Sequence, residues 1–379
     1  MVICQDWYLK MKTISIVFSN HCDLDCSYCC IQSKNLSPVN RSLDDICSFI
    51  DRYYQDGSEI EFYGGEPTLH KDEINSLLEY IERRGLNVHT RLYTNGLFNS
   101  WTQEEIVSIC SRIDEILISL DGYYYEENRC RFSSKYDYDR CIDNIALIRN
   151  LGCSLGISTV LFGLDKYSSI YRNYLLFKDL GISYFSYEPL TVFRTDKPVV
   201  IPRDHLFELI RQIYMIILDT IRTNTRNSLF IAKELIAASW YSNGDKTRCS
   251  KIVRALSPRG NVYMCRDHAA NEEEMFYSPK TIQFFSTNQF KSSNESFPVI
   301  ESRENVLTVC PVKNIQYEEL DIKDKLYWLS DDYQKYLIKP LYESIIAINS
   351  QNEELYPFVE NVASNIDDII HHFKKGTKW

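Results

Sequence analysis

The sequence has no long hydrophobic run, no export signal and no excess of basic residues. No stretch of about 18 or more apolar residues occurs, which a membrane-spanning helix would need. The N-terminal segment MVICQDWYLKMKTISIVFSN is interrupted by Asp6, Lys10 and Lys12, unlike a secretory signal peptide. The formal net charge of −10 argues against binding nucleic acid through its phosphates, which requires a basic surface. We therefore expect a cytoplasmic protein with neither a membrane nor a nucleic acid as partner.

Cysteine occurs 13 times, but without export these thiols do not indicate a disulfide framework. Reduced thiols in a cytoplasmic protein point to metal binding, catalysis or core filling. Six of them have no metal-like spacing and are expected to fill the core: Cys4, Cys47, Cys110, Cys130, Cys141 and Cys153.

The segment from residue 13 to about 190 alternates β-rich runs with helical periods. The expected strands are 13–18, 59–64, 88–94, 115–120, 154–161 and 182–188. The expected helices lie near 42–55, 71–84, 103–112, 137–150 and 168–179. This series of β–α units predicts an α/β fold, a parallel sheet curled into a partial (β/α)6 TIM-like barrel.

The chain is expected to continue into a small C-terminal domain and a helical tail. The expected divisions are an N-terminal extension (1–12), the barrel (13–200), a helical linker (201–245), the small domain (246–322) and a C-terminal helical segment (323–379). Within these divisions, 203–240 is expected to be helical, 279–305 loop-rich and 323–372 helical again. A β-hairpin with Pro258-Arg259-Gly260-Asn261 as its turn is expected in the small domain.

Unusual residues follow each of the first four predicted strands. In barrels of this kind the chemistry lies on the loops at the C-terminal ends of the strands. Cys22 follows the first strand, 64–67 the second, 94–96 the third and 121–122 the fourth. These loops are therefore predicted to meet at one edge of the sheet.

Cys22, Cys26 and Cys29 form a C-x3-C-x2-C pattern in the first of these loops. Three thiolates can hold three irons of a [4Fe–4S] cluster. The fourth iron would then remain open, and an open iron can chelate the amino and carboxylate groups of a methionine. Zinc is the alternative, with His21 or Cys30 as an added ligand.

The motifs in these four loops resemble those of a known enzyme family. CDLDCSYC after a β-strand resembles the cysteine signature of radical SAM enzymes, and GGEP (64–67) resembles their second landmark. TNG (94–96) and SLDG (119–122) resemble the sulfatase-maturing and peptide-maturing branch. The resemblance implies a [4Fe–4S] cluster on the three cysteines that cleaves bound S-adenosylmethionine reductively.

The same motifs supply candidate cofactor-binding residues: Tyr28, Gly64, Gly65, Glu66, Asn95, Ser119, Asp121 and Arg129. The two glycines would let the backbone approach a ligand without a Cβ in the way. Glu66 offers a carboxylate to the methionyl ammonium group, and Arg129 could pair with the methionine carboxylate. Tyr28 either flanks the adenine or packs in the core. Asp121 either reaches a ribose hydroxyl with Ser119 or only forms a turn. The residues that act on the substrate are not identified.

A second cysteine set lies in the predicted small domain. Cys249, Gly260 and Cys265 resemble the opening of the SPASM domain and of its shortened twitch relative. Cys310 is the candidate third ligand, but Lys313 stands where a second cysteine of a C-x2-C pair is expected, and no cysteine follows. The resemblance thus implies one auxiliary Fe–S cluster rather than two. The alternative is a degenerate site whose cysteines are structural.

The resemblance implies an enzyme that matures ribosomally made peptides (RiPP) by hydrogen abstraction, through a cross-link such as a cyclophane, an epimerisation or an oxidation. Its expected partners are a precursor peptide, an electron donor such as flavodoxin or ferredoxin, and a separate leader-recognition protein. One alternative is a radical SAM dehydrogenase or epimerase acting on a small molecule such as an aminoglycoside. Another is a non-catalytic Fe–S or zinc scaffold, which a fourth ligand closing the first cluster would indicate.

Overall fold

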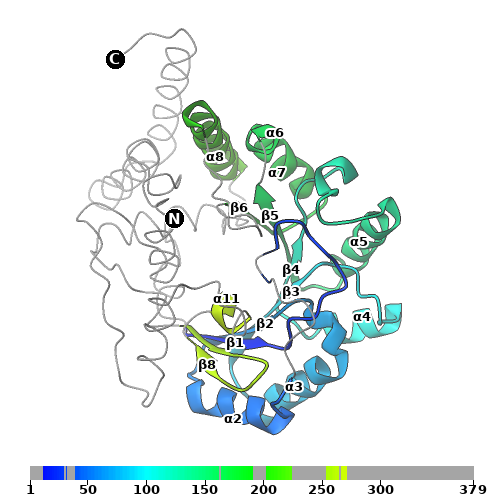
Figure 1. Cartoon of the computed structure of the whole chain (residues 1–379), viewed down its shortest axis with the longest axis vertical. Helices are drawn as coiled ribbons and strands as arrows, with labels where there is room; N and C mark the ends of the chain where they lie inside the picture. The colour runs from blue at the N-terminus through cyan, green and yellow to red at the C-terminus, as the bar shows by residue number, and fades with distance from the viewer. Residues whose placement is uncertain are drawn as a thin grey trace, which may run out of the picture. The chain divides into compact units, whose positions relative to one another are not determined.

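The computed structural model describes residues 12–29, 31, 39–161, 164–190, 202–223, 253–263 and 266–270 (Figure 1). The predictions for 279–305 and 323–372 lie outside these residues, as does the predicted helical continuation beyond 223. So do Cys4, Cys30, Cys249, Cys265 and Cys310.

The described strands form one eight-stranded sheet in the order β6-β5-β4-β3-β2-β1-β7-β8. Their bounds are β1 Thr13–Val17, β2 Ser58–Tyr63, β3 Val88–Thr94, β4 Glu115–Ser119, β5 Ser154–Leu161, β6 Tyr184–Pro189, β7 Val253–Leu256 and β8 Val262–Tyr263. Neighbours from β1 to β5 pair in parallel. The predicted α/β barrel-type fold is confirmed, and the six predicted strands begin and end within two residues of their observed bounds.

The helices between the strands also match the sequence pattern. They are α2 Leu43–Tyr53, α3 Lys71–Arg84, α4 Gln103–Cys110, α5 Lys135–Ile148, α6 Leu164–Tyr167, α7 Ile170–Asp179, α8 Arg203–Thr223 and α11 Arg266–Ala269, with 3-10 turns η1 Pro67–His70 and η2 Tyr125–Asn128. Capping boxes begin two of them, where Ser42 and Thr102 each accept from the amide three residues on. Gly85, at a φ of 62°, ends α3 in the left-handed conformation.

The chain divides into two compact units, Met1–Ser158 with Thr247–Val299 and Thr159–Lys246 with Ile300–Trp379. The division falls inside β5. All three cysteines of the C-x3-C-x2-C motif and the loops after β2, β3 and β4 belong to the first unit. The domain boundaries expected from the sequence remain predictions.

The two faces of the sheet in the first unit differ sharply. On one face Ile14, Ile16, Ile60, Phe62 and others are fully buried, and helices α2 to α5 run along this side (Figure 1). Because side chains alternate along a strand, the other face is formed by the intervening residues. We call it the inner face, and it carries these buried polar residues: Ser15, Glu59, Glu61, Arg91 and Glu115.

The predicted hairpin exists and extends the barrel sheet. Strands β7 and β8 are antiparallel, and Gly260, at a φ of 87°, donates its amide to Ser257 O at 3.0 Å in the turn between them. Strand β7 also pairs in parallel with β1, a pairing the sequence did not indicate. Residues of α11 then pack against β1 and β7 in a small cluster that includes Val17, Ala255 and Ala269 and is lined by Cys29. The hairpin therefore lies next to the strand that leads into the cysteine motif.

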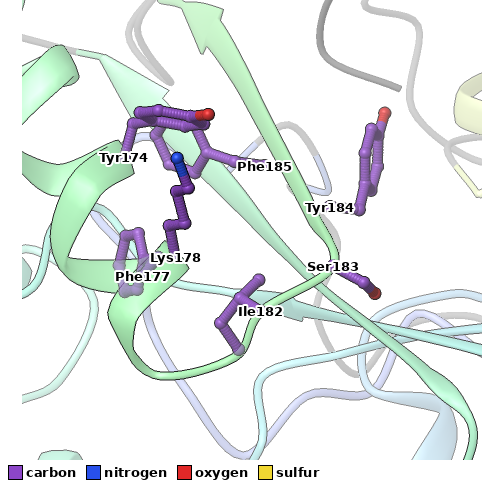
Figure 2. Close-up of a pocket in the computed structure, with 7 residues that line it drawn as sticks. All are labelled: Tyr174, Phe177, Lys178, Ile182, Ser183, Tyr184 and Phe185. Carbon is purple, nitrogen blue, oxygen red and sulfur yellow. The ribbon is translucent and has the colours of Figure 1, made fainter. Parts of the chain in front are cut away.

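In the second unit, α7 packs against β6 and α8 through aromatic and charged contacts. Lys178 reaches Asp219 of α8 at 2.6 Å, and Tyr174 donates to the same carboxylate at 3.0 Å. Figure 2 shows the shallow hollow that α7 and β6 leave between Phe177, Lys178 and Phe185. Within the described residues, no helix is both long and apolar enough to cross a membrane.

Candidate cofactor site

The three motif cysteines lie on the loop that follows β1, which we call the cysteine loop (residues 19–29). Cys26 is buried, Cys22 and Cys29 are half-buried, and none of the three forms a disulfide. The Cys29 amide donates to Cys26 O at 3.1 Å, and the Leu24 amide lies 3.5 Å from the Cys22 sulfur. One short loop thus presents three thiols outside any disulfide, the donor set that an Fe–S cluster requires.

The glycine pair of GGEP packs directly on the backbone of this loop. The Gly65 amide donates to Ser19 O and the Glu66 amide to His21 O, each at 2.8 Å. A Cβ on Gly65 would lie 2.2 Å from His21 O, and one on Gly64 would lie 2.6 Å from Ser19 O. Glycine is needed here so that two backbones can meet. The approach of a ligand to these glycines remains a prediction.

The TNG motif after β3 holds the cysteine loop from another side. The Asn95 side chain donates to Asp23 Oδ1 at 2.6 Å, and Asn99 donates to Asp23 Oδ2 at 2.6 Å. The Asn95 amide also donates to Glu66 Oε2 at 2.7 Å. Asn95 therefore joins three predicted motifs, and its direct contact with the cofactor stays a prediction.

Glu66 is a buried carboxylate that only neutral groups bind. Besides Asn95, its donors are the Thr68 amide at 3.0 Å, the Thr68 hydroxyl at 2.7 Å and the Thr94 hydroxyl at 2.8 Å. Burial raises the pKa of Glu66 to about 7, although these hydrogen bonds act to lower it. Within the described part of the chain, no Lys, Arg or His forms an ion pair with Glu66. A carboxylate in this state fits a ligand that brings its own cation, such as an ammonium group.

A second polar group surrounds Cys26. Tyr28 donates its hydroxyl to Asp121 Oδ2, and Arg131 pairs with Asp121 Oδ1 at 3.1 Å. The Arg131 guanidinium lies 5.6 Å from the centre of the Tyr28 ring, and its NH1 lies 3.9 Å from the Cys26 sulfur. Burial and the neighbouring Asp121 raise the pKa of Tyr28 well above its usual range, against the effect of Arg131. Tyr28 is therefore a neutral donor in this group.

The remaining predicted residues occupy different places. Ser119 ends β4, half-buried, and its hydroxyl makes no hydrogen bond to any described residue. Arg129 is exposed, with its guanidinium 5.8 Å from the centre of the Tyr125 ring, whereas Arg131 is buried next to the cysteine loop. The sequence motifs indicated Arg129 and gave no sign of Arg131. The pairing of Arg129 with a methionine carboxylate stays a prediction.

A chain of hydrogen bonds supports the start of the cysteine loop. His70 Nε2 lies 2.7 Å from the Ser19 hydroxyl, and His70 Nδ1 lies 3.1 Å from Glu73 Oε1. Arg41 pairs with the other Glu73 oxygen at 3.3 Å. The Ser19 hydroxyl is buried and accepts the His21 amide at 3.2 Å. The order Ser–His–Glu resembles the catalytic triad of a hydrolase. The Ser19 hydroxyl, however, is buried and already accepts a backbone amide, so its role is to stabilise the cysteine loop rather than to act as a nucleophile.

An ion-pair network on the inner face is a second feature that was not predicted from the sequence. Arg91 lies 2.9 Å from Glu59 and 2.5 Å from Glu115, and Arg266 of α11 lies 2.6 Å from Glu61. Glu59, His89 and Glu115 also have the mutual spacing of metal ligands. Arg91 already supplies a cation there. The signal was present in the alternating charges of SEIEFY and VHTRLYT, which place opposite charges on the same face of adjacent strands.

Some of the other cysteines lie within the residues that the structure describes, and some lie outside them. Cys110 and Cys141 are fully buried, and burial raises the pKa of the Cys141 thiol to about 12, so core filling is confirmed for both. Cys249, Cys265 and Cys310 lie outside the described residues, and their ligation of an auxiliary cluster remains a prediction.

Comparison with known proteins agrees with this geometry. Residues 16–169 match the radical SAM superfamily. A curated Methanocaldococcus jannaschii protein, described as a glycyl-radical enzyme activating enzyme, is 26% identical over 144 residues. That match covers 37% of this chain and 52% of the relative, so the chain spans about half the length of that protein.

Solved structures share the fold over more of the chain. Native anSMEcpe with bound AdoMet has a TM-score of 0.62 at 16% identity, covering 93% of this chain and 99% of that one. Streptococcus suis SuiB bound to the precursor peptide SuiA has a TM-score of 0.50 at 16% identity, covering 88% and 66%. The cysteine loop and its supporting turns therefore lie within the segment that matches the radical SAM superfamily. The fold is similar to those of anSMEcpe and SuiB.

Proposed function

We propose that this protein uses a [4Fe–4S] cluster on Cys22, Cys26 and Cys29 to cleave S-adenosylmethionine reductively and to abstract a hydrogen atom from a peptide. The supporting observation is that the loop bearing three thiols outside any disulfide packs against the turn that carries Glu66, a buried carboxylate with which no cation of the described residues pairs. The cluster, when bound, supplies the electron for cleavage. Glu66 would bind the methionyl ammonium group, and the glycine turn would fix the position of Glu66 against the cysteine loop.

Product analysis after anaerobic reconstitution tests the first half of this proposal. The wild-type protein is expected to form 5′-deoxyadenosine and methionine from S-adenosylmethionine with dithionite as reductant. Simultaneous replacement of Cys22, Cys26 and Cys29 by Ala is expected to abolish both products. Cys47→Ala on α2 is the matched control and should retain activity, because Cys47 is a half-buried thiol on another element. Full activity in the triple variant would refute the proposal.

A peptide substrate is supported by the fold. The structures of anSMEcpe with bound AdoMet and a Cp18Cys peptide and of SuiB with SuiA each contain a bound peptide. The test uses candidate precursor peptides deuterated at single residue types. Transfer of deuterium into 5′-deoxyadenosine, with a mass change in the peptide, is the expected result. Deuterium transfer from a small-molecule alcohol or amine, with none from any peptide, would favour the dehydrogenase or epimerase alternative.

An auxiliary cluster on Cys249, Cys265 and Cys310 belongs to the same proposal. One cubic cluster holds about four irons and two hold about eight, and we expect the larger number in the wild-type protein. The triple variant at Cys22, Cys26 and Cys29 should then retain about four irons and its visible absorption. A colourless, iron-free triple variant would show that the second cysteine set is structural.

A second candidate function is activation of a partner enzyme by forming a glycyl radical on it. The M. jannaschii relative favours it, since that protein is described as such an activating enzyme. The match is confined to 37% of this chain, whereas the fold of anSMEcpe extends over 93%. A persistent glycyl radical signal in a partner protein after turnover would favour this alternative over peptide maturation.

A further inference from the structure

Arg131 and Asp121 form a buried ion pair with its positive end toward a cysteine of the cluster motif. The side chain of Arg131 is 9% exposed and that of Asp121 is 0% exposed. Arg131 NH1 faces the Cys26 sulfur at 3.9 Å, while its NH2 holds Asp121 at 3.1 Å. The Nε of Arg131 is buried and has no hydrogen-bond partner among the described residues. The NH1 group therefore places positive charge next to the sulfur through which Cys26 would hold a cluster.

The pair is held rigidly in this orientation. The Asp121 amide donates to Asn128 Oδ1 at 2.8 Å, and the Tyr28 hydroxyl holds the carboxylate oxygen that Arg131 does not bind. The Asn128 side chain in turn donates to Gly122 O and Tyr124 O, both at 2.8 Å. The Asp121 carboxylate is thus held from two sides, and through its ion pair it orients the Arg131 guanidinium beside the Cys26 sulfur.

We propose that the Arg131–Asp121 pair sets the reduction potential of the cluster held by Cys22, Cys26 and Cys29, an inference that rests on the proposed function. Reduction adds one electron, taken from an external one-electron donor, and no bond forms or breaks in this step. The cluster with its thiolates thereby gains one negative charge. Hydrogen bonds and charge at the sulfurs are established controls of this potential. Arg131 stabilises the reduced state through its charge beside Cys26, and the negative charge of Asp121, which pairs with the same guanidinium, opposes it.

The two charges predict shifts of opposite sign. Arg131→Gln removes the stabilising cation and leaves Asp121 uncompensated, so the reduced state should become harder to reach. Asp121→Asn removes the opposing anion and should make reduction easier. The double variant should return close to the wild-type potential, because both charges are lost together. A purely structural pair would instead shift the potential in the same direction in both single variants, or in neither.

The experiment is a potentiometric titration of the reconstituted protein, followed by the EPR signal of the reduced cluster in the absence of S-adenosylmethionine. At a fixed solution potential, Arg131→Gln should lower the ratio of reduced to oxidised cluster about tenfold, which is about 59 mV for a one-electron couple. Asp121→Asn should raise the ratio severalfold. If an auxiliary cluster is present, its signal is recorded separately in the triple cysteine variant and subtracted.

Arg112→Gln is the matched control. Arg112 pairs with Glu82 at 2.7 Å, and both residues lie at the N-terminal ends of the strands, the edge opposite the cysteine loop. Its removal should leave the potential unchanged. Arg131→Lys keeps the charge and should lie between wild type and Arg131→Gln.

Three outcomes would overturn the inference. They are an unchanged potential in both single variants, shifts of the same sign in both, and an Arg112→Gln shift as large as that of Arg131→Gln. If Arg131→Gln does not retain a cluster, the direction of the Asp121→Asn shift decides. The measurement needs no turnover, so failure of the proposed peptide chemistry would not change its result. A protein without any first cluster would instead refute the proposed function.

Discussion

Glu61 on β2 and Glu66 in the turn after it are both buried carboxylates, yet their surroundings differ. Glu61 pairs with Arg266 at 2.6 Å and lies 3.7 Å from Arg91. Burial alone would raise the pKa of Glu61, but these two cations and the Ser15 hydroxyl outweigh it and lower the pKa. Glu66 has four neutral donors and a pKa raised to about 7. Cations of the described residues therefore compensate Glu61, and none of them compensates Glu66 in the candidate cofactor site.

This difference separates a buried carboxylate that cations of the described residues compensate from one that they do not. An unpaired buried charge is costly, so a protein retains one only where a ligand completes it or where the group becomes neutral. On the inner face, Arg266 also lies 4.3 Å from the centre of the Tyr93 ring and 4.8 Å from that of Tyr63. Arg266 thus ties α11 to β2 and β3 by charge and by aromatic contact. The charges of this face serve the assembly of the sheet with the segment after β8.

The largest expected effect comes from removing a compensated charge. Glu61→Gln would leave Arg266 without its ion-pair partner and would remove a negative charge that lies 3.7 Å from Arg91. The free energy of unfolding should therefore fall by about 3 kcal/mol. Chemical denaturation at neutral pH measures this change. Ser15→Ala, which removes only a hydroxyl donor to Glu61, is the control and should cost about 1 kcal/mol. A loss for Glu61→Gln no greater than that of the control would contradict the ion-pair assignment.

Glu66→Gln should instead change how stability depends on pH. The folded-state pKa of about 7 is raised above the unfolded value near 4.3, so Glu66 favours folding at low pH. That contribution is lost as pH rises through 7. The stability of the wild-type apoprotein relative to Glu66→Gln should therefore fall by roughly 3 kcal/mol between about pH 4.5 and 8. If replacing the carboxylate by an amide has a cost in stability that does not depend on pH, that cost is the same at both ends of the range and leaves the pH dependence unchanged.

Saturating S-adenosylmethionine provides the complementary measurement for Glu66. Its ammonium group would hold the carboxylate ionised, so the pH dependence should flatten in the reconstituted wild-type protein. Affinity for S-adenosylmethionine should fall about tenfold or more in Glu66→Gln, as expected when a charge-assisted hydrogen bond is lost. Unaltered affinity together with an unaltered slope would remove Glu66 from the cofactor site.

Gly65→Ala should disrupt the cofactor site with a smaller loss of stability. The new Cβ would lie 2.2 Å from His21 O, so the turn and the cysteine loop must separate. We expect a cost of about 1–3 kcal/mol and the loss of most iron from the first cluster. Gly57→Ala is the control, because it adds a Cβ at a φ of 77°, which strains the backbone, but that Cβ meets no atom within 4 Å. Equal iron contents in the two variants would contradict the proposed loop contact.

The regular elements could be predicted because their signals are local. Alternating apolar residues mark β3 and β5, and the caps at Ser42 and Thr102 mark the first turns of α2 and α4. The meeting of four loops at one edge followed from the parallel topology alone. The strands and caps need only the chain within about ten residues of each position, and the meeting of the loops needs in addition only the order of the strands and helices.

Features that depend on long-range packing could not be predicted in this way. Arg129 and Arg131 are two residues apart in an irregular segment, where no periodicity shows which one turns inward. The pairing of β7 with β1 joins residues about 240 positions apart along the chain and carries no local signal. Likewise, the sequence shows that Gly65 lacks a side chain but not that the carbonyl of His21 occupies its place.

The smallest expected effect is that of breaking a surface ion pair. Comparing it with the loss of a buried ion pair tests whether burial determines how much an ion pair contributes to stability. Lys135 and Asp139 are paired at 2.7 Å one turn apart on α5, with side chains 66% and 51% exposed. Water solvates both charges before and after the pair is broken, so Lys135→Ala should change the free energy of unfolding by no more than about 0.5 kcal/mol. Urea denaturation of this variant beside Glu61→Gln compares the loss of one charge at two depths. A loss above about 1.5 kcal/mol for Lys135→Ala would mean that ion pairing itself, independent of burial, governs the stability of this fold.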